Sequence, residues 1–467
     1  MLRLLLLFPL LLIFGPTSGQ IVTIRGQASG YEGRELLFYT FPEPISHEKK
    51  RLAEAKVEAD GTFQLHFQTD QTIEVYTDLE KYRGTLVVEP GANYQLSLPG
   101  WSPRSTREAA SPYFEPELYW LSIKDLKPTE INFLVRSFLT EYNKELAAHT
   151  LDLYQKRSAD SLNAIVDRLE KSYPDRQNSY LSILKRYSYG EMEYIVCQPN
   201  KELIAKKYFA SAEVALSHPA YQHLFNAIFS EYLIGKSMDI RQKNFIIPAL
   251  QGDFQGWVAQ LTGNGYQKEI AELVVVKSFY DGYFSNKFDK RAMLRGLKDA
   301  FAGATCAPLK AVLPTILLKT NALREGSQAP VLQLKNPNGS PGPLAMNGKF
   351  VYLAFFRSDS KSCREELDSL VSINKKLSSV LTIVSVSLDK NPSDAIQLWN
   401  TKKYPWGLTF PYSPDKIQSD FKVTSTPLFY LIGPDHSLLL SPALPPSHNF
   451  ESLFLKIYRE SSFREKK

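Results

Sequence analysis

Cysteine and histidine are scarce in this chain, and their scarcity excludes several kinds of structure. Only 3 cysteines and 7 histidines occur among 467 residues, so a small fold stapled by many disulfides is excluded. The cysteines are Cys197, Cys306 and Cys363, and an odd number leaves at least one thiol without a partner in the chain. A disulfide between Cys197 and Cys306 stays open, but we favour both as small buried apolar residues.

Clusters that would hold a metal ion or a nucleotide are also missing. His218 and His223 are five residues apart, with no third ligand nearby, so we expect surface or helix-capping roles for them. The sequence has neither a glycine-rich phosphate loop nor a dinucleotide fingerprint. We therefore predict no metal site and no cofactor.

Charge of one sign is not concentrated anywhere in the sequence. The formal net charge is +6 and the pI is near 8.8, but no block of lysine and arginine is dense enough for a nucleic-acid groove. We therefore expect no nucleic-acid partner. Hydrophobic residues make up 43% and charged residues 22% of the chain, which is typical of globular proteins and predicts roughly two to four domains at this length.

A continuous apolar run occurs only near the N-terminus. A positive charge at Arg3 precedes apolar residues 4–14, and small residues follow at 15–19. This order predicts an export signal over residues 1–19. The run is shorter than the ~20 residues that cross a bilayer, and no later segment is apolar enough to do so. We predict an exported protein of the periplasm or cell envelope, without a membrane span in the mature chain.

Residues 20–100 have the pattern of an all-β domain. Short β-rich runs alternate with turn signals such as Asp60-Gly61 and the Pro-Gly pair at 90–91, which predicts a small β-sandwich. The expected strands lie at residues 22–24, 36–39, 62–67, 73–76, 85–88 and 94–98. A stretch rich in proline, serine and arginine at 99–112 then predicts a linker.

Residues 113–320 have the apolar periodicity of helices. Ile131, Leu134, Val135 and Phe138 fall on one helical face. Similar faces are formed by Leu162, Ile165, Val166 and Leu169 and by Trp257, Val258 and Leu261. We predict a helical domain over 113–320 and expect these apolar residues to lie in its core.

Residues 326–460 alternate between strand-like and helix-like runs, which predicts an α/β domain. The expected strands are at 350–356, 381–388, 428–432 and 438–440, and the expected helices are around 367–373, 394–403 and 450–458. The first of these strands leads into residues 354–366, the most informative stretch of the chain, where Cys363-Arg364-Glu365-Glu366 begins an amphipathic helix.

Three motifs in this region, taken in order, resemble the TlpA-like thiol-disulfide oxidoreductases of the bacterial envelope. They are Gly-x-x-Ala-Pro at 326–330, Cys-Arg-Glu-Glu at 363–366 and Thr426-Pro427 before a hairpin. Residues 20–100 also resemble the β-domain that is often fused to such proteins, through Asp-Gly-Thr-Phe at 60–63 and Val-Glu-Pro-Gly at 88–91. The resemblance implies a thioredoxin-like fold over 326–460. It also implies a cis bond before Pro427 and a peptide-binding edge at Thr426 and Pro427.

The motif departs from that family where its chemistry takes place. Its four residues are Ser360, Lys361, Ser362 and Cys363, so the resemblance aligns the attacking cysteine of the family with Ser360. Disulfide exchange proceeds through a thiolate, and a serine oxygen cannot form a mixed disulfide. The aromatic residue that precedes the first cysteine in the family aligns with Asp359. The acidic or amide residue often found six positions before that cysteine aligns with Ala354. We therefore predict a protein that binds a protein or peptide partner and lacks dithiol exchange.

Alternative interpretations of the motif stay open. Cys363 alone would be the catalytic residue of a thiol-exchange enzyme or of a peroxiredoxin-like enzyme, although Phe356 replaces the proline of the latter family. In another alternative, the role of the protein is purely structural, and the thioredoxin-like fold is retained as an assembly module. In the structural alternative, Cys363 is a packed thiol and Ser360 or Ser362 caps a helix, with 362–365 matching a capping box. A serine-hydrolase role is disfavoured, because nothing places His436 or His448 beside Ser360.

Overall fold

The computed structural model describes residues 19–105, 108, 114–174, 178–197, 200–285, 287–321, 323–342, 348–423 and 425–464. The predicted export signal at 1–19 lies outside these residues, apart from Gly19. The described chain forms two compact units. The first takes its residues from Met1–Thr106 and Glu115–Leu317, and the second from Arg107–Phe114 and Leu318–Lys467. The boundaries of the three predicted domains stay a prediction.

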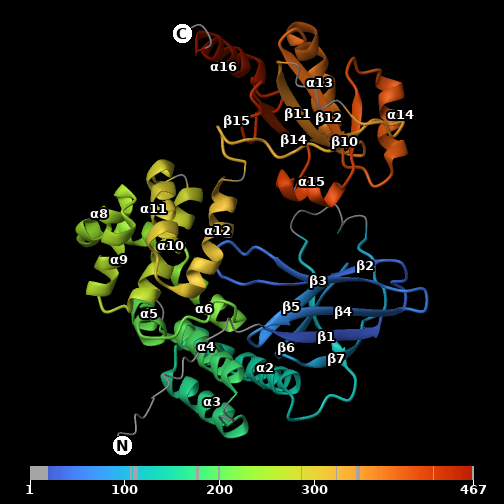
Figure 1. The fold of residues 1–467 in the computed structure, drawn as a ribbon. Helices are drawn as coiled ribbons and strands as arrows, with labels where there is room; N and C mark the ends of the chain where they lie inside the picture. Colours follow the sequence, from blue (N-terminus) through green and yellow to red (C-terminus); the bar gives the residue numbers. More distant parts are fainter. Residues whose placement is uncertain are drawn as a thin grey trace, which may run out of the picture. The chain divides into compact units, whose positions relative to one another are not determined.

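Two β-sheets enclose one apolar core in the N-terminal region of the first unit (Figure 1). One sheet has the order β4-β1-β7-β9, and the other has the order β3-β2-β5-β6-β8. Val22 and Leu65 of the first sheet and Phe38 and Val75 of the second belong to this core. The strands are β1 Gln20–Gln27, β2 Glu35–Thr40, β3 Lys50–Lys56, β4 Thr62–Thr69, β5 Ile73–Leu79, β6 Tyr82–Val88, β7 Asn93–Ser97, β8 Glu117–Trp120 and β9 Ser122–Ile123.

Three of these strands were not predicted from the sequence. Strand β3 is rich in lysine, glutamate and alanine, which favour helices, and of its residues only Ala55 is buried. It forms through pairing with β2 at the sheet edge. Strands β8 and β9 lie in the segment that we expected to be helical, and they pair with β6 and β7. Tertiary pairing therefore overrides local preference at both places.

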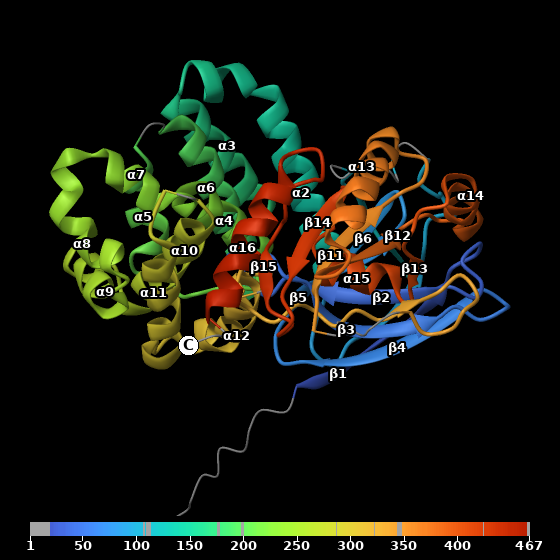
Figure 2. The same cartoon turned by 90° about the horizontal axis from the view of Figure 1, so that it is seen from above.

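Helices make up the rest of the first unit, and the packed group of α8, α9, α10 and α11 is visible in both ribbon views (Figures 1 and 2). The predicted core positions Val135, Phe138 and Trp257 are buried. The helices are α2 Ile131–Ala148, α3 Ala159–Ser172, α4 Ser179–Val196, α5 Lys201–Phe209, α6 Pro219–Phe229, α7 Tyr232–Met238, α8 Lys243–Gln251, α9 Phe254–Gly263, α10 Lys268–Phe284, α11 Lys290–Gly303 and α12 Ala307–Asn321, with a π-helix η1 Leu151–Gln155 and a 3-10 helix η2 Ile240–Gln242. The end of α12, from Leu318 on, belongs to the second unit. Within the described ranges, no helix has both the length and the apolar character that crossing a bilayer requires.

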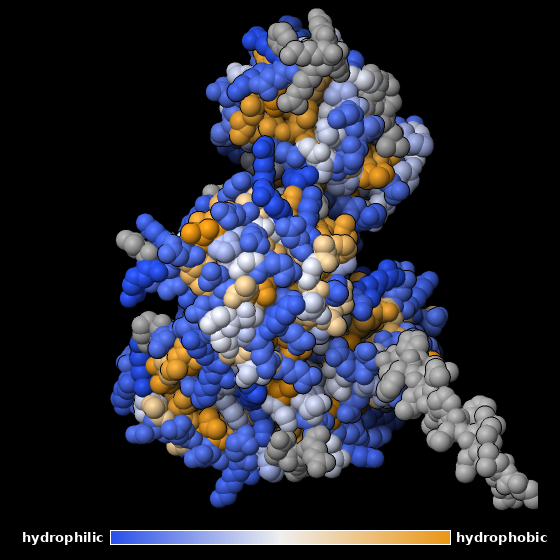
Figure 3. Space-filling model, turned by 60° about the vertical axis from the view of Figure 1, so that its left-hand side comes forward, coloured by the Kyte–Doolittle hydropathy of each residue, from blue (hydrophilic) through white to orange (hydrophobic). Residues whose placement is uncertain are grey.

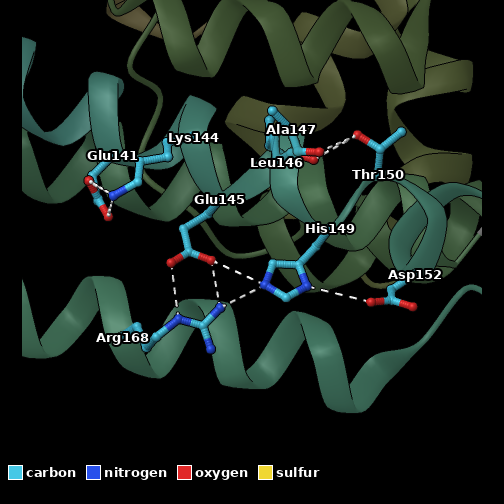
Figure 4. A network of polar contacts seen from close by, with 9 residues as sticks. All are labelled: Glu141, Lys144, Glu145, Leu146, Ala147, His149, Thr150, Asp152 and Arg168. Atoms are coloured by element: carbon cyan, nitrogen blue, oxygen red, sulfur yellow. Dashed lines mark hydrogen bonds and ion pairs between the residues drawn. The ribbon is translucent and has the colours of Figure 1, made fainter.

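A polar network joins the end of α2 to α3 at the surface (Figure 4). Arg168 of α3 donates from Nε to Glu145 Oε1 at 3.0 Å and from a terminal nitrogen to Oε2 at 2.5 Å. His149 lies between Glu145 and Asp152, with nitrogen–oxygen distances of 3.5 Å to each. These bonds span the π-helix η1 and hold α2 and α3 together.

Buried hydrogen bonds attach the helices to the five-stranded sheet. The Asn132 side chain of α2 accepts from Val87 N at 2.9 Å and donates to Val87 O at 2.7 Å. Tyr180 of α4 extends its hydroxyl toward Glu74 of β5 at 3.5 Å, and burial raises the pKa of this carboxyl. Unpaired polar groups are costly inside a protein, so these contacts fix how the sheet and helices pack within the first unit.

His218 is part of this junction and begins helix α6. Ala220 N donates to His218 Nδ1 at 3.2 Å, and His218 Nε2 lies 3.1 Å from Tyr180 O. Because Nδ1 accepts a hydrogen bond, only Nε2 carries a proton and the ring is neutral. Burial lowers the pKa of His218 from 6.5 to about 4. The predicted capping role of His218 is confirmed, and His223 is exposed beside Glu191.

The stability of the first unit should fall as the pH drops from 6.5 to about 4. In this window the unfolded chain binds a proton at His218 and the folded chain does not, so protons favour unfolding. At about 1.4 kcal/mol for each pH unit, the loss from this group is about 3 kcal/mol. Urea unfolding across this window should show a smaller fall for His218→Asn, which keeps a cap without the titration.

His223→Gln is the matched control for this measurement. Hydrogen bonding to Glu191 raises the pKa of His223, so removing this ring should leave the acid-induced fall in place. Equal falls for His218→Asn and the wild type would contradict the assignment to His218.

The second unit is built on a mixed sheet of order β10-β13-β12-β11-β14-β15. Strands β11, β12 and β13 are parallel, while β14 and β15 form an antiparallel hairpin. The predicted strands are present, whereas β10, β13 and α15 were not predicted. The elements are β10 Leu334–Lys335, β11 Phe350–Phe356, α13 Lys361–Leu377, β12 Leu381–Ser387, α14 Pro392–Lys402, β13 Leu408–Pro411, α15 Pro414–Asp420, β14 Leu428–Ile432, β15 Leu438–Leu440 and α16 Phe450–Arg464.

Alternate residues of β11 face two different apolar clusters. Tyr352 and Phe356 belong to one cluster, with residues of α13 and α16, and Leu353 and Phe355 belong to the other, with residues of α15. The chain thus combines a β-rich N-terminal region, a helical middle and a C-terminal α/β sheet.

Candidate functional site

The predicted motif lies where strand β11 ends and helix α13 begins. Ser360 is the N-cap of α13, with an extended backbone, and its Oγ accepts from Cys363 N at 3.3 Å. This confirms the capping role predicted for one of the two serines. The capping box starting at Ser362 is wrong, because Ser362 already lies in the first turn, with its Oγ 3.0 Å from Ser360 Oγ. Lys361, the first residue of the helix, is exposed.

Residues of α13, of β12 and of the loop after β12 hold the loop that precedes the cap. A guanidinium nitrogen of Arg364 donates to Ser358 O at 2.6 Å. Ser358 N donates to Asp389 Oδ1 at 2.9 Å, and Ser387 Oγ donates to Asp389 Oδ2 at 2.9 Å. Sequence analysis missed Asp389. Its position just after a buried strand could have indicated it, because parallel neighbouring strands end at the same edge of the sheet.

Cys363 is fully buried within the second unit. Its exposed fraction is 0%, and it belongs to the apolar cluster that contains Phe356, Leu367 and Leu370. All three cysteines are free, so Cys197 and Cys306 form no disulfide. Cys306 is buried and Cys197 is partly buried in the core of the first unit, which agrees with the packing role that we favoured. The motif therefore presents a serine hydroxyl at the helix start and a thiol beneath it.

The second part of the predicted site meets the first at one edge of the sheet. The bond between Thr426 and Pro427 is cis, as the resemblance implied. In the antiparallel pairing of β11 and β14, Phe355 lies opposite Leu428. Pro427 therefore enters β14 at the edge where β11 leaves the sheet for the motif. Thr426 and Pro427 are partly exposed there.

Two other residue positions limit the chemistry at this edge. Ala354, aligned above with an acidic or amide residue, is 1% exposed and packed in the same cluster as Cys363, so it supplies no proton acceptor. Among the described residues, no histidine is hydrogen-bonded to Ser360. His436 lies in the turn after β14, at the opposite end of that strand from Pro427, and His448 contacts Ser447 at 2.9 Å. Ser360 therefore has no general base of the Ser–His type.

The geometry is that of a thioredoxin-type site, with a strand leading into a helix start and a cis proline on the adjacent strand. The thioredoxin-like protein YneN of Bacillus subtilis (strain 168) is 32% identical over 120 residues, which cover 24% of this chain and 68% of that protein. This chain belongs to the thioredoxin-like proteins. No family model matches it.

Several solved structures are similar to parts of the chain. A thioredoxin-like protein from Bacteroides caccae covers 53% of this chain and 98% of its own, at 15% identity and a TM-score of 0.30. The thioredoxin domain of a thiol-disulfide oxidoreductase from Bacteroides vulgatus covers 28% and 95%, at 20% identity and 0.26. A thiol:disulfide interchange protein from a Bacteroides species covers 28% and 89%, also at 20% identity and 0.26.

Cys363 should resist alkylation in the native protein. Its thiol is 0% exposed, so reaction with N-ethylmaleimide requires opening of the fold and should be at least about a hundredfold slower than in urea. Peptide mass mapping after timed labelling measures each cysteine separately. Cys197 is partly exposed and serves as the internal reference that reacts first. Labelling of Cys363 as fast as Cys197 in native protein would contradict the burial.

Proposed function

We propose that this protein is an exported, TlpA-like member of the thioredoxin-like proteins that binds a protein or peptide partner and does not exchange dithiols. The observation that carries the proposal is the pair formed by Ser360 and Cys363. An oxygen occupies the start of the helix, and the remaining sulfur is 0% exposed. The pattern at residues 1–19 supports a location in the periplasm or cell envelope.

Dithiol exchange needs two sulfur atoms at the site, one of which must reach a substrate as a thiolate. Ser360 Oγ cannot form a mixed disulfide, and it already accepts a hydrogen bond from Cys363 N. Cys197 and Cys306 pack into the core of the first unit. The described residues therefore offer no second thiol to complete a cycle, and a single-cysteine reaction at Cys363 would require the buried thiol to become exposed.

Peptide binding requires less of the site than redox chemistry does. The hydrogen-bonded pairing of β11 with β14 stops at Leu428, so the backbone at Thr426 lies beyond the ladder. Ser425 is exposed and Thr426 is partly exposed. An extended segment of a partner can pair with such backbone in the manner of an added strand. Replacing sulfur by oxygen at Ser360 leaves this surface in place.

Ser360→Cys should give the protein a reductase activity that the wild type lacks. The change restores two sulfur atoms at the spacing of the redox family on an unchanged strand, loop and helix. In an insulin-reduction assay we expect the variant to exceed the wild type by at least about tenfold, because only a thiolate attacks a disulfide efficiently.

Ser362→Cys is the matched control for this experiment, since it adds a sulfur in the same helical turn at the wrong spacing. Turnover of insulin by the wild type at the rate of Ser360→Cys would refute the absence of dithiol exchange. A soluble Ser360→Cys protein without activity would show that other departures, such as Ala354, also limit the site.

A photoreactive p-benzoylphenylalanine at position 426 should capture the partner. The same group at Tyr412, which is 52% exposed in the same unit, is the control for nonspecific reaction. Cross-linked bands from an envelope extract of the producing organism should be present for position 426 and absent for position 412. Identical bands at both positions, or none at 426, would contradict binding at the proline edge.

A further inference from the structure

A pocket opens in the helical part of the first unit, among elements that have no role in the proposed function. Its volume is about 700 Å³, within the ~300–1,000 Å³ that is common for small-molecule sites. The pocket is lined by residues of the first half of α5, the turn between α6 and α7, helix α7 and helix η2. Lys287 also lines it.

The deepest residues of the pocket are apolar, and most residues around its opening are polar or charged. Ala205 and Ile228 line it and belong to the main core of the first unit, with exposed fractions of 1% and 3%. Met238, another lining residue, is 73% exposed. On the face drawn in Figure 3, hydrophobic residues are exposed in separate patches among hydrophilic ones. A concave site with an apolar interior is a place where a ligand buries apolar surface favourably.

Gly235 keeps one wall of the pocket open. This glycine lies inside α7, where it costs about 1 kcal/mol of helix stability relative to alanine. A Cβ added at Gly235 would meet no atom within 4 Å, whereas a Cβ at Gly190, Gly282 or Gly296 would lie within 2.6 Å of a neighbouring side chain. Packing explains the other three glycines but not Gly235. Its lack of a side chain leaves space in the pocket.

The charges around the pocket leave an excess of positive charge. Lys236 pairs with Glu202 at 3.0 Å, and Arg241 pairs with Asp239 at 3.0 Å. Lys201 and Lys287 also line the pocket, and within the described part of the chain neither forms an ion pair with a carboxylate. Lys201 instead donates to Ala227 O at 3.3 Å. Among the described lining residues, Glu231 supplies the one remaining carboxylate, compared with the two ammonium groups of Lys201 and Lys287.

The backbone at Glu231 is also strained. Its φ is 55°, in the left-handed region, which costs a residue with a Cβ about 1–2 kcal/mol. Asp281 Oδ2 accepts from Glu231 N at 3.1 Å and holds the corner in place. This conformation shapes the turn from α6 into α7 at the pocket wall.

We propose that this pocket binds an aliphatic carboxylate, with its apolar chain against Ala205 and Ile228 and its head near Lys201 and Lys287. The apolar residues at its inner end, and the excess of basic over acidic side chains in its lining, together favour an amphipathic anion. Gly235 provides the room for its chain. This site lies in the first unit, and its occupancy does not depend on the thioredoxin-type motif.

Decanoate and decyltrimethylammonium, both below their micelle concentrations, are the probes for this site in the full-length protein. They share a chain length and differ in the sign of the head group. Isothermal titration should show that decanoate binds at least about fivefold more tightly than the cation, a difference of about 1 kcal/mol. Equal affinities, or no binding of decanoate, would overturn the proposal.

Two pairs of variants locate the binding. Gly235→Leu fills the pocket and should weaken decanoate binding at least about tenfold, whereas Gly235→Ala should retain it. The double change Lys201→Gln and Lys287→Gln should weaken decanoate binding about fivefold and leave binding of the cation unchanged. Lys206→Gln, on α5 but outside the pocket lining, should have no effect.

Circular dichroism and thermal unfolding report whether each variant folds. Should Gly235→Leu fail to fold, the lysine variant alone decides the outcome, because its side chains are solvent-exposed. Wild-type affinity for decanoate in a folded Gly235→Leu or in the double lysine variant would overturn the proposal.

Discussion

Burial of strand β11 on both faces is the constraint on which the second unit depends. All seven of its residues are buried, and hydrogen bonds to β12 and β14 satisfy both of its edges. A strand held in this way leaves the sheet at a fixed point, after Phe356. The position of the loop, of the first turn of α13 and of the proline edge all follow from that point.

At the helix start, Ser360 caps α13 at the position that the resemblance aligns with a cysteine. Oxygen accepts hydrogen bonds well, and serine is a favoured N-cap, whereas the sulfur of cysteine is a weak acceptor. Ser360 therefore stabilises α13 by accepting a hydrogen bond from Cys363 N at 3.3 Å. Arg364, Asp389 and Ser387 continue to hold the loop. The strand, loop and helix start are held in place by these contacts, and the absence of dithiol exchange stays part of the proposed function.

The first unit has a different physical basis. Its sheets and helices meet through buried polar groups, and Glu74, Tyr180 and His218 make contacts that are sensitive to protonation. Hydrogen bonds between distant segments, such as Gln222 to the Phe41 carbonyl at 2.8 Å, join β-rich and helical regions into one compact unit. The pocket beside Gly235 lies away from this junction, so a ligand there would contact the helical part alone.

The sequence by itself determined the element types wherever apolar periodicity was strong. The strand at 350–356, the buried faces of α2 and α9, and the helix start at the motif were predicted from residue pattern, because side chains alternate in strands and repeat every 3.6 residues in helices. The absence of a Cys-x-x-Cys pair at 360–363 was also readable directly, since it depends only on residue identity.

Only the tertiary structure decided the remaining features. Strand β3 forms because β2 offers it an edge, although its own residues favour a helix. The choice of Ser360 over Ser362 as the cap depends on where β11 leaves the sheet. Burial of Cys363, the role of Asp389 and the open space beside Gly235 all depend on neighbours distant in the chain, because packing and hydrogen bonding join residues that local sequence does not relate.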